Sequence, residues 1–250
     1  GGSVNIDRKF YGFGMQYQFG ESLPENFSLT TGFDTDRQDD DRKRFNNDSG
    51  KLGSMSFDQQ EKVNSNGLFV QSRYDLGNWS ISSGIRYDEV KFDITDRFLS
   101  NGDDSGEIEF DAVSPSFGLN YVMENASIFA SMSSSFETPT TTELANPDAS
   151  GGFNALLKPQ EASNIEIGYK SVKNDIYHEI AVFNIDLNDE LVPYELEEFP
   201  GRTFYSNVGK SSRKGIESLL SWSVKPNLTV DASYTYSDFS FDSFIDKNNK

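Results

Sequence analysis

The stretch Tyr11-Gly12-Phe13-Gly14-Met15-Gln16-Tyr17-Gln18-Phe19 alternates strictly between apolar residues and small or polar ones. Side chains along a strand point alternately to its two faces, so this stretch predicts a strand with one apolar and one polar face. The same alternation recurs in Trp79–Tyr87, Val113–Tyr121 and Leu228–Tyr236. No comparable stretch follows a helical period, and the chain is therefore predicted to be all-β.

The predicted strands are about nine or ten residues long, near the ~9–11 residues that cross a bilayer at a tilt. Strands of soluble sheets are usually shorter, ~5–6 residues. The polar faces carry mainly Ser, Gly, Asn, Thr and Gln, with few Lys or Glu. A hydrated lumen accepts this mixture, whereas the solvent face of a soluble sheet normally carries more charge. Length and composition together favour the wall of a transmembrane barrel.

A turn signal repeats along the chain at intervals of about fifty residues. Asn followed by an apolar residue and Ser or Thr begins at Asn26, Asn78, Asn125 and Asn227, and a variant begins at Asn174. Between these short turns lie long polar segments, at about residues 37–64, 95–109, 136–160 and 189–203. Short periplasmic turns and long extracellular loops are the layout of an outer-membrane barrel. A β-propeller has a similar period and is the soluble alternative, but each blade fits four short strands into that length.

The amino-acid composition argues against several classes of function. The chain has 40 acidic and 22 basic residues, a net charge of −18, which argues against nucleic-acid binding. Without cysteine there are no disulfides, thiolate metal sites or Cys nucleophiles. The single histidine, His178, cannot build a histidine zinc site and is expected to be a surface or interfacial residue. We predict no enzymatic activity, no cofactor and no metal. The longest apolar run, Ile180 to Phe183, is too short for a transmembrane helix.

Five segments between Ser135 and Glu217 resemble the β-barrel of TonB-dependent outer-membrane receptors. They are Ser135-Phe-Glu-Thr-Pro-Thr-Thr-Thr-Glu-Leu144, Leu157-Lys-Pro-Gln-Glu161, Asn164-Ile-Glu-Ile-Gly-Tyr-Lys170, Asn207-Val-Gly-Lys-Ser211 and Gly215-Ile-Glu217. Each segment is weak alone, but their order and spacing make the match fairly specific. The motif residues are Phe136, Glu137, Thr138, Pro139, Glu143, Leu144, Glu166, Gly168, Asn207, Gly209, Gly215 and Glu217.

The resemblance implies a barrel of about 22 strands filled by an N-terminal plug. It also implies uptake of a scarce ligand, such as a ferric siderophore or other iron complex, through the TonB complex. About ten strands are expected here. Residues 1–250 would then be a partial barrel domain, a fragment without the plug, the TonB box, the final strands or a signal peptide. We expect a monomeric barrel in the lipid of the bacterial outer membrane; the alternative is a passive porin or adhesin-like barrel.

Candidate ligand-binding residues lie in the predicted extracellular loops. Arginines there can bind the anionic oxygens of a ferric chelate through charge-assisted hydrogen bonds. A solvated loop of mixed charge is the simpler interpretation. The candidates are Arg37, Arg42, Arg44, Arg97 and Phe153. The Thr138-Pro139 pair is expected to stop strand pairing and to direct the following loop over the barrel mouth. A direct ligand contact by that loop is the functional alternative.

Overall fold

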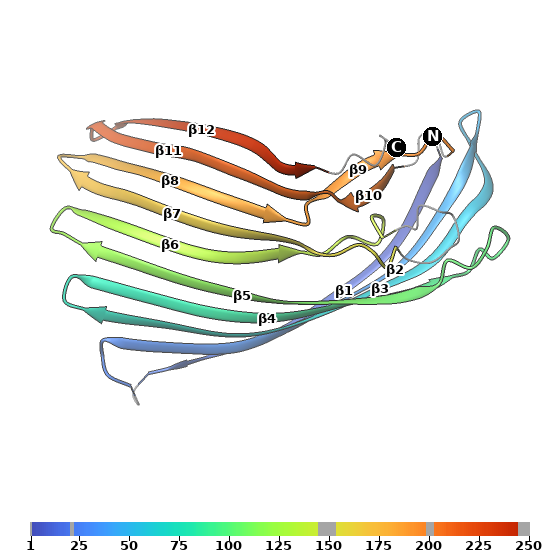
Figure 1. Ribbon diagram of the computed structural model, residues 1–250, viewed down its shortest axis with the longest axis horizontal. Coiled ribbons are helices and arrows are strands. Elements are labelled where there is room, and N and C mark those ends of the chain that lie inside the picture. The colour runs from blue at the N-terminus through green and yellow to red at the C-terminus, as the bar shows by residue number, and fades with distance from the viewer. Residues whose placement is uncertain (1, 21–22, 145–153, 199–202, 245–250) are drawn as a thin grey trace.

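The computed structural model describes residues 2–20, 23–144, 154–198 and 203–244. Ten strands form one antiparallel sheet in the order β1-β2-β3-β4-β5-β6-β7-β8-β11-β12, and β9 and β10 form a separate hairpin (Figure 1). The predicted all-β antiparallel architecture is confirmed. The strands are β1 (Ser3–Phe19), β2 (Phe27–Asp48), β3 (Lys51–Leu76), β4 (Trp79–Asp96), β5 (Gly106–Val122), β6 (Ala126–Glu137), β7 (Gln160–Lys173), β8 (Ile176–Asn188), β9 (Leu191–Glu195), β10 (Thr203–Asn207), β11 (Gly209–Lys225) and β12 (Leu228–Phe244).

None of the described residues forms a helix long and apolar enough to cross a membrane.

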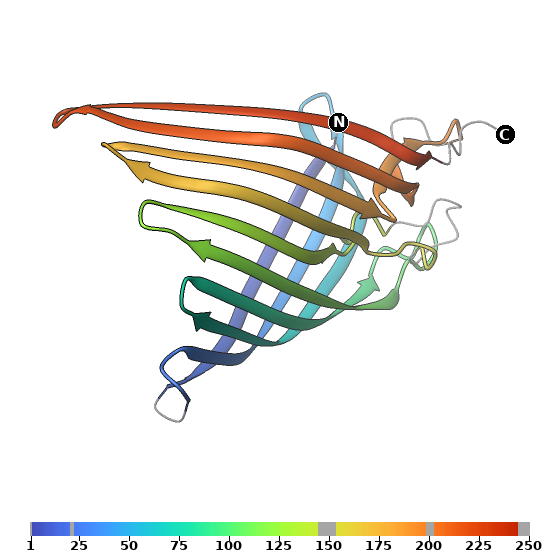
Figure 2. The same ribbon diagram turned by 60° about the vertical axis from the view of Figure 1, so that its left-hand side comes forward.

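Nearly every strand pairs with its neighbour in sequence, and the sheet curls strongly from β1 to β12 (Figures 1 and 2). Short turns join the strands at one end, on the left in Figure 1, and the longer connections between β4 and β5, β6 and β7, and β8 and β11 lie at the other. Asn174 and Asp175 have φ values of 50° and 64°, as a type I′ turn between two strands requires. The predicted alternation of short turns and long connections is confirmed except between β2 and β3, and the end with the longer connections is called the long-loop end below.

The sheet strands are longer than the sequence predicted, 12 residues in β6 and 26 in β3. The segment 37–64, predicted as a loop, is instead part of the β2–β3 ladder, which turns only at Ser49 and Gly50. Residues 189–203 likewise include β9 and the start of β10. The polar ends of these strands pair through the backbone but do not alternate between apolar and polar residues. The alternation therefore predicted only the apolar part of each strand.

Residues that pair across the sheet share a face, so the register divides the side chains into two sets. We call outer the face that carries Leu68, Val70, Tyr87, Ile167 and Val182. These apolar side chains are 41–61% exposed. The opposite face, called inner, carries the buried Asp40, Glu61, Asp88 and Phe110. An exposed apolar face and a covered, more polar face fit a barrel wall between lipid and lumen.

On the inner face, three phenylalanine rings lie over glycines of the neighbouring strand. The pairs are Phe69 with Gly32, Phe129 with Gly168, and Phe183 with Gly215. A Cβ on Gly168 would lie 2.3 Å from Cζ of Phe129 and 2.9 Å from the carbonyl oxygen of Ile180. Two of the motif glycines, Gly168 and Gly215, therefore leave room for a cross-strand aromatic ring, which explains the type of residue at both positions.

Replacing Gly168 with alanine should destabilise the folded barrel of the full-length protein by about 1–3 kcal/mol, because the added methyl group overpacks a filled site. The temperature at which the folded band is lost in semi-native electrophoresis measures the change. Gly20→Ala is the control, since nothing lies within 4 Å of its Cβ position. Equal melting of the two variants would contradict the packing role of Gly168.

Candidate functional site

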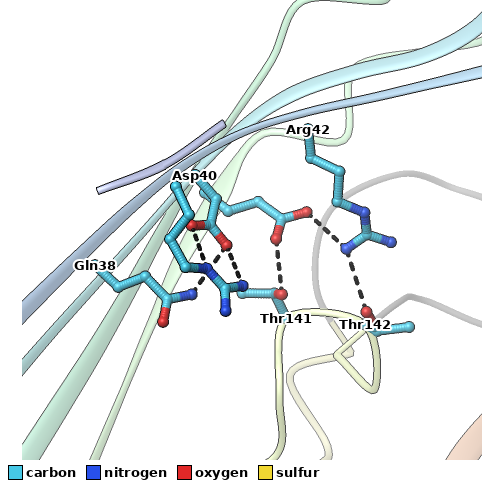
Figure 3. A network of polar contacts seen from close by, with 7 residues as sticks. Gln38, Asp40, Arg42, Thr141 and Thr142 are labelled. Atoms are coloured by element: carbon cyan, nitrogen blue, oxygen red, sulfur yellow. Dashed lines mark hydrogen bonds and ion pairs between the residues drawn. The ribbon is translucent and has the colours of Figure 1, made fainter. Parts of the chain in front are cut away.

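The inner face of β1 to β3 carries a charged network at the long-loop end (Figure 3). Arg8 donates two hydrogen bonds to Asp40, from Nε to Oδ1 at 2.8 Å and from Nη2 to Oδ2 at 2.6 Å. Gln38 Nε2 donates a third to Asp40 at 3.0 Å. Asp40 is 2% exposed, so its charge depends on these donors.

The same network ties a distant segment to the sheet. Glu61, 3% exposed, accepts a bond from Arg42 at 3.0 Å and another from the Thr141 hydroxyl at 2.8 Å. Arg42 also donates to Thr142 Oγ1 at 3.2 Å, a contact across 100 residues of sequence. The connection between β6 and β7 therefore folds onto the inner face of β2 and β3, as Figure 3 shows. Its described residues, 138–144 and 154–159, are called the docked segment below.

The motif residues at the start of the docked segment build a single hydrogen-bonded turn. The Glu143 carboxylate accepts a bond from the Thr140 backbone N–H at 2.7 Å, and the Thr140 carbonyl accepts bonds from the Glu143 and Leu144 N–H groups. A glutamate that reaches back three residues is half of a capping box. Pro139 is buried before the turn and has no N–H to leave unpaired. The Thr-Pro-Thr-Thr-Thr-Glu sequence thus shapes the turn that presents Thr141 and Thr142.

Apolar contacts fix the docked segment more firmly than its hydrogen bonds do. Leu144 is completely buried and Leu157 is 3% exposed, and both pack in one cluster with Phe92 of β4 and Phe110 of β5. Phe92 and Phe110 lie on the inner face, opposite Val63 and Val90 respectively. Burying a leucine side chain stabilises by about 1.5–3 kcal/mol. The cluster therefore holds both ends of the connection against β4 and β5.

Asn207 anchors the far end of the docked segment. Its amide donates to the carbonyls of Lys158 at 3.0 Å and Asp189 at 2.6 Å, and its Oδ1 accepts from the Lys158 N–H at 2.9 Å. Gly209 follows with a φ of 112°, a conformation that favours glycine, and begins β11. The Asn-x-Gly motif therefore joins the docked segment, the end of β8 and the start of β11.

The remaining motif residues other than Thr138 lie on the strands. Phe136 and Glu137 end β6 opposite Glu161 and Gln160. Glu166 and Glu217 lie on the inner face, opposite Phe183 and Ala181 of β8. Thr138 links β6 to the buried Pro139.

The structure separates the candidate ligand-binding arginines by face. Arg42 and Arg44 share the inner face, with their guanidinium carbons 5.2 and 4.9 Å from the ring centroid of Phe57. Arg37 lies on the outer face opposite Tyr11, and Arg97 binds Asp41, also on that face, at 2.7 Å. Phe153 lies outside the described residues. Whether any of the five binds a ligand stays a prediction.

The sequence interpretation grouped residues by loop and missed the partners Arg8, Asp40, Glu61 and Phe57. A signal for β2 is present: Gln38, Asp40, Arg42 and Arg44 stand at every second position, as inner-face residues of one strand must. Among the described residues, no three His, Asp or Glu side chains are grouped so that they could hold a metal ion.

Comparisons with known proteins match this architecture. A family model described as "TonB dependent receptor-like, beta-barrel" matches residues 2–250. The ferrioxamine receptor of Yersinia enterocolitica is 25% identical over 193 residues, which are 73% of this chain and 24% of that protein. This chain therefore spans about a quarter of that relative's length.

Two solved structures share the fold. The copper transporter OprC has a TM-score of 0.77 at 15% identity, over 95% of this chain and 38% of its own. The FrpB iron transporter of Neisseria meningitidis (F3-3 variant) has a TM-score of 0.67 at 20% identity, over 95% of this chain and 36% of its own. At these identities the likeness concerns the fold alone.

Proposed function

This chain belongs to the family of TonB-dependent receptor β-barrels, and from that premise we propose that it is part of the wall of a receptor that imports an iron complex. Barrels of this family lie in the outer membrane of Gram-negative bacteria. The ligand class we propose is a ferric siderophore or a similar iron chelate, taken up with energy from the TonB complex. The chain catalyses no reaction in this proposal.

The observation that carries the proposal is the match to the family model along residues 2–250, together with a relative named as a ferrioxamine receptor. The docked segment adds support, because it folds over the inner face at the end where a ligand would enter. A passive porin or adhesin-like barrel, the alternative, has no need of the family's motif segments. We assign the exposed outer face to lipid and the inner face to a plug and to the ligand path.

In this proposal residues 1–250 are a partial barrel domain of about ten sheet strands from a barrel of about 22, and the plug and TonB box belong to the rest of a longer protein. The complete barrel is monomeric. A reading frame that contains this chain should encode a plug of more than a hundred residues upstream, at the length usual for a domain. A reading frame without one would favour the passive barrel.

Uptake by the full-length protein tests the function. Cells that lack their own siderophore receptors are supplied with the gene and with a radiolabelled ferric tris-hydroxamate. We expect iron accumulation that saturates with chelate concentration and disappears in an otherwise identical strain without TonB. Uptake that persists without TonB would identify a passive pore instead, and an absence of uptake for every iron chelate would overturn the proposed ligand class.

A further inference from the structure

We propose that the chelate recognised at this wall is electrically neutral or cationic, and that polyanionic ferric complexes are disfavoured. This inference rests on the proposed function and specifies the charge of its ligand. It comes from the ion pairs that the arginines of the inner face form with carboxylates. It concerns the same end of the sheet as the docked segment.

Four arginines of the inner face are already bound to carboxylates. The guanidinium group is the side chain best suited to grip an anionic chelate, because its donors match carboxylate and similar oxygens in pairs. Here those donors are directed to protein acids. The pairs are Arg8 with Asp40 at 2.6 Å, Arg86 with Asp34 at 2.7 Å, Arg42 with Glu61 at 3.0 Å, and Arg213 with Glu190 at 3.1 Å.

An anionic ligand would have to break these pairs before it could use the arginines. Asp40 and Glu61 are 2% and 3% exposed, and each would be left as a buried carboxylate without its cation. An unpaired buried charge is strongly unfavourable, so the pairs resist exchange. Arg44 stands over the ring of Phe57, at 4.9 Å from its centroid, together with Arg42. The sequence-based idea that these arginines grip anionic oxygens is therefore weakened at Arg42.

Carboxylates, by contrast, remain in surplus on the same face. Asp36 lies opposite Gly12 and Ser65 with no cation opposite it in the register. The carboxylate of Asp96, a residue 7% exposed, accepts backbone N–H bonds from Phe98 and Asp104. Glu137 accepts a hydrogen bond from the neutral amide of Gln160. Their net field attracts a cation to the mouth and repels an anion, and the chain's overall charge of −18 has the same sign.

The test compares two ferric chelates that share the same iron-binding groups and differ at one terminal group. One is a linear ferric tris-hydroxamate with a terminal ammonium group, and the other is the same chelate with that amine converted to a succinyl amide, which ends in a carboxylate. Binding to the purified full-length receptor is followed by quenching of its tryptophan fluorescence. We expect the cationic chelate to bind at least tenfold more tightly at low salt, with a ratio that falls as salt screens the charges.

Variants on the two faces locate the effect. Asp36→Lys should lower the affinity ratio at least threefold, and Asp36→Asn should lower it by a smaller factor with less disturbance of the fold. Asp7→Lys makes the same charge change on the outer face of β1, opposite Asp41, and should leave the ratio close to that of the unmodified receptor.

Three results would overturn the inference. Equal affinity for the two chelates, or tighter binding of the anionic one, refutes it while the uptake function stands. A ratio that responds equally to Asp7→Lys and Asp36→Lys refutes the role of the inner face. Failure of a folded receptor to bind either hydroxamate refutes the inference, and the uptake assay with other iron chelates then decides whether the proposed ligand class fails as well.

Discussion

Replacing Leu144 with alanine should release the docked segment from the inner face of the sheet. Leu144 is completely buried against Phe92, Phe110 and Leu157. Leucine-to-alanine substitutions at such sites cost about 2–5 kcal/mol, through lost burial and the cavity that remains. This segment forms one turn with a few hydrogen bonds, so a loss of that size exceeds what Thr141 and Thr142 can replace. Limited proteolysis of the full-length receptor should then cut within residues 138–159 much faster than in the unmodified protein.

Leu156 supplies a matched control one residue from the other buried anchor. It is 85% exposed, against 3% for Leu157, so Leu156→Ala removes the same atoms without opening a cavity. Its cleavage rate should equal that of the unmodified receptor. If Leu144→Ala and Leu156→Ala were cut at the same rate, the apolar cluster would not be what holds the segment.

Replacing Glu61 with alanine should destabilise the long-loop end by about 3–5 kcal/mol, because Arg42 loses its carboxylate in a buried setting. The Arg42 side chain is 11% exposed and that of Glu61 is 4% exposed, so water reaches neither group freely. Thr141 loses its acceptor as well. Glu61→Gln keeps an acceptor oxygen and should show a smaller effect. The thermal midpoint of the purified full-length receptor measures the difference.

An exposed pair provides the comparison. Lys91 and Glu107 lie 2.8 Å apart with side chains 39% and 66% exposed, and Glu107→Ala should leave the midpoint unchanged because exposed pairs contribute little. The double variant Glu61→Ala/Arg42→Ala should lose less stability than the two single variants added together, since the second change removes an already unpaired charge. Additive losses would show that the pair does not act as a unit.

The sheet was predictable because a barrel wall imposes a simple alternation on the side chains of its strands. Tyr11 to Phe19 alternate between an exposed apolar face and a face of small or polar residues, and Asn174-Asp175 marks a turn by its backbone preference. The parts of β2 and β3 at the long-loop end were not predicted as strands, because both faces of the strands are mainly polar there. Backbone pairing continues through Arg44 and Phe57 with no signal in hydropathy.

The docked segment was recognisable as a motif, but its position was not predictable. Its contacts join Thr142 to Arg42 and Thr141 to Glu61, residues far apart in sequence on elements whose register the pattern did not reach. Likewise, Arg37 and Arg42 read as one basic cluster, yet five positions separate them, an odd number, and they face opposite sides of the strand. Whether two of these residues meet therefore depends on whether an even or an odd number of positions separates them along the strand. That rule could be applied only once the segment was known to be a strand.

The assignment of lipid and lumen faces is the claim on which the rest depends, and single cysteines test it directly. This chain contains no cysteine, so probes can be placed without removing native ones from it. In the full-length receptor in liposomes, labels at Val70→Cys and Val182→Cys should be quenched by quenchers attached to lipid chains. Labels at Ser116→Cys and Glu166→Cys, on the inner face, should escape that quenching. Equal quenching on both faces, or stronger quenching at Ser116 and Glu166, would contradict the account.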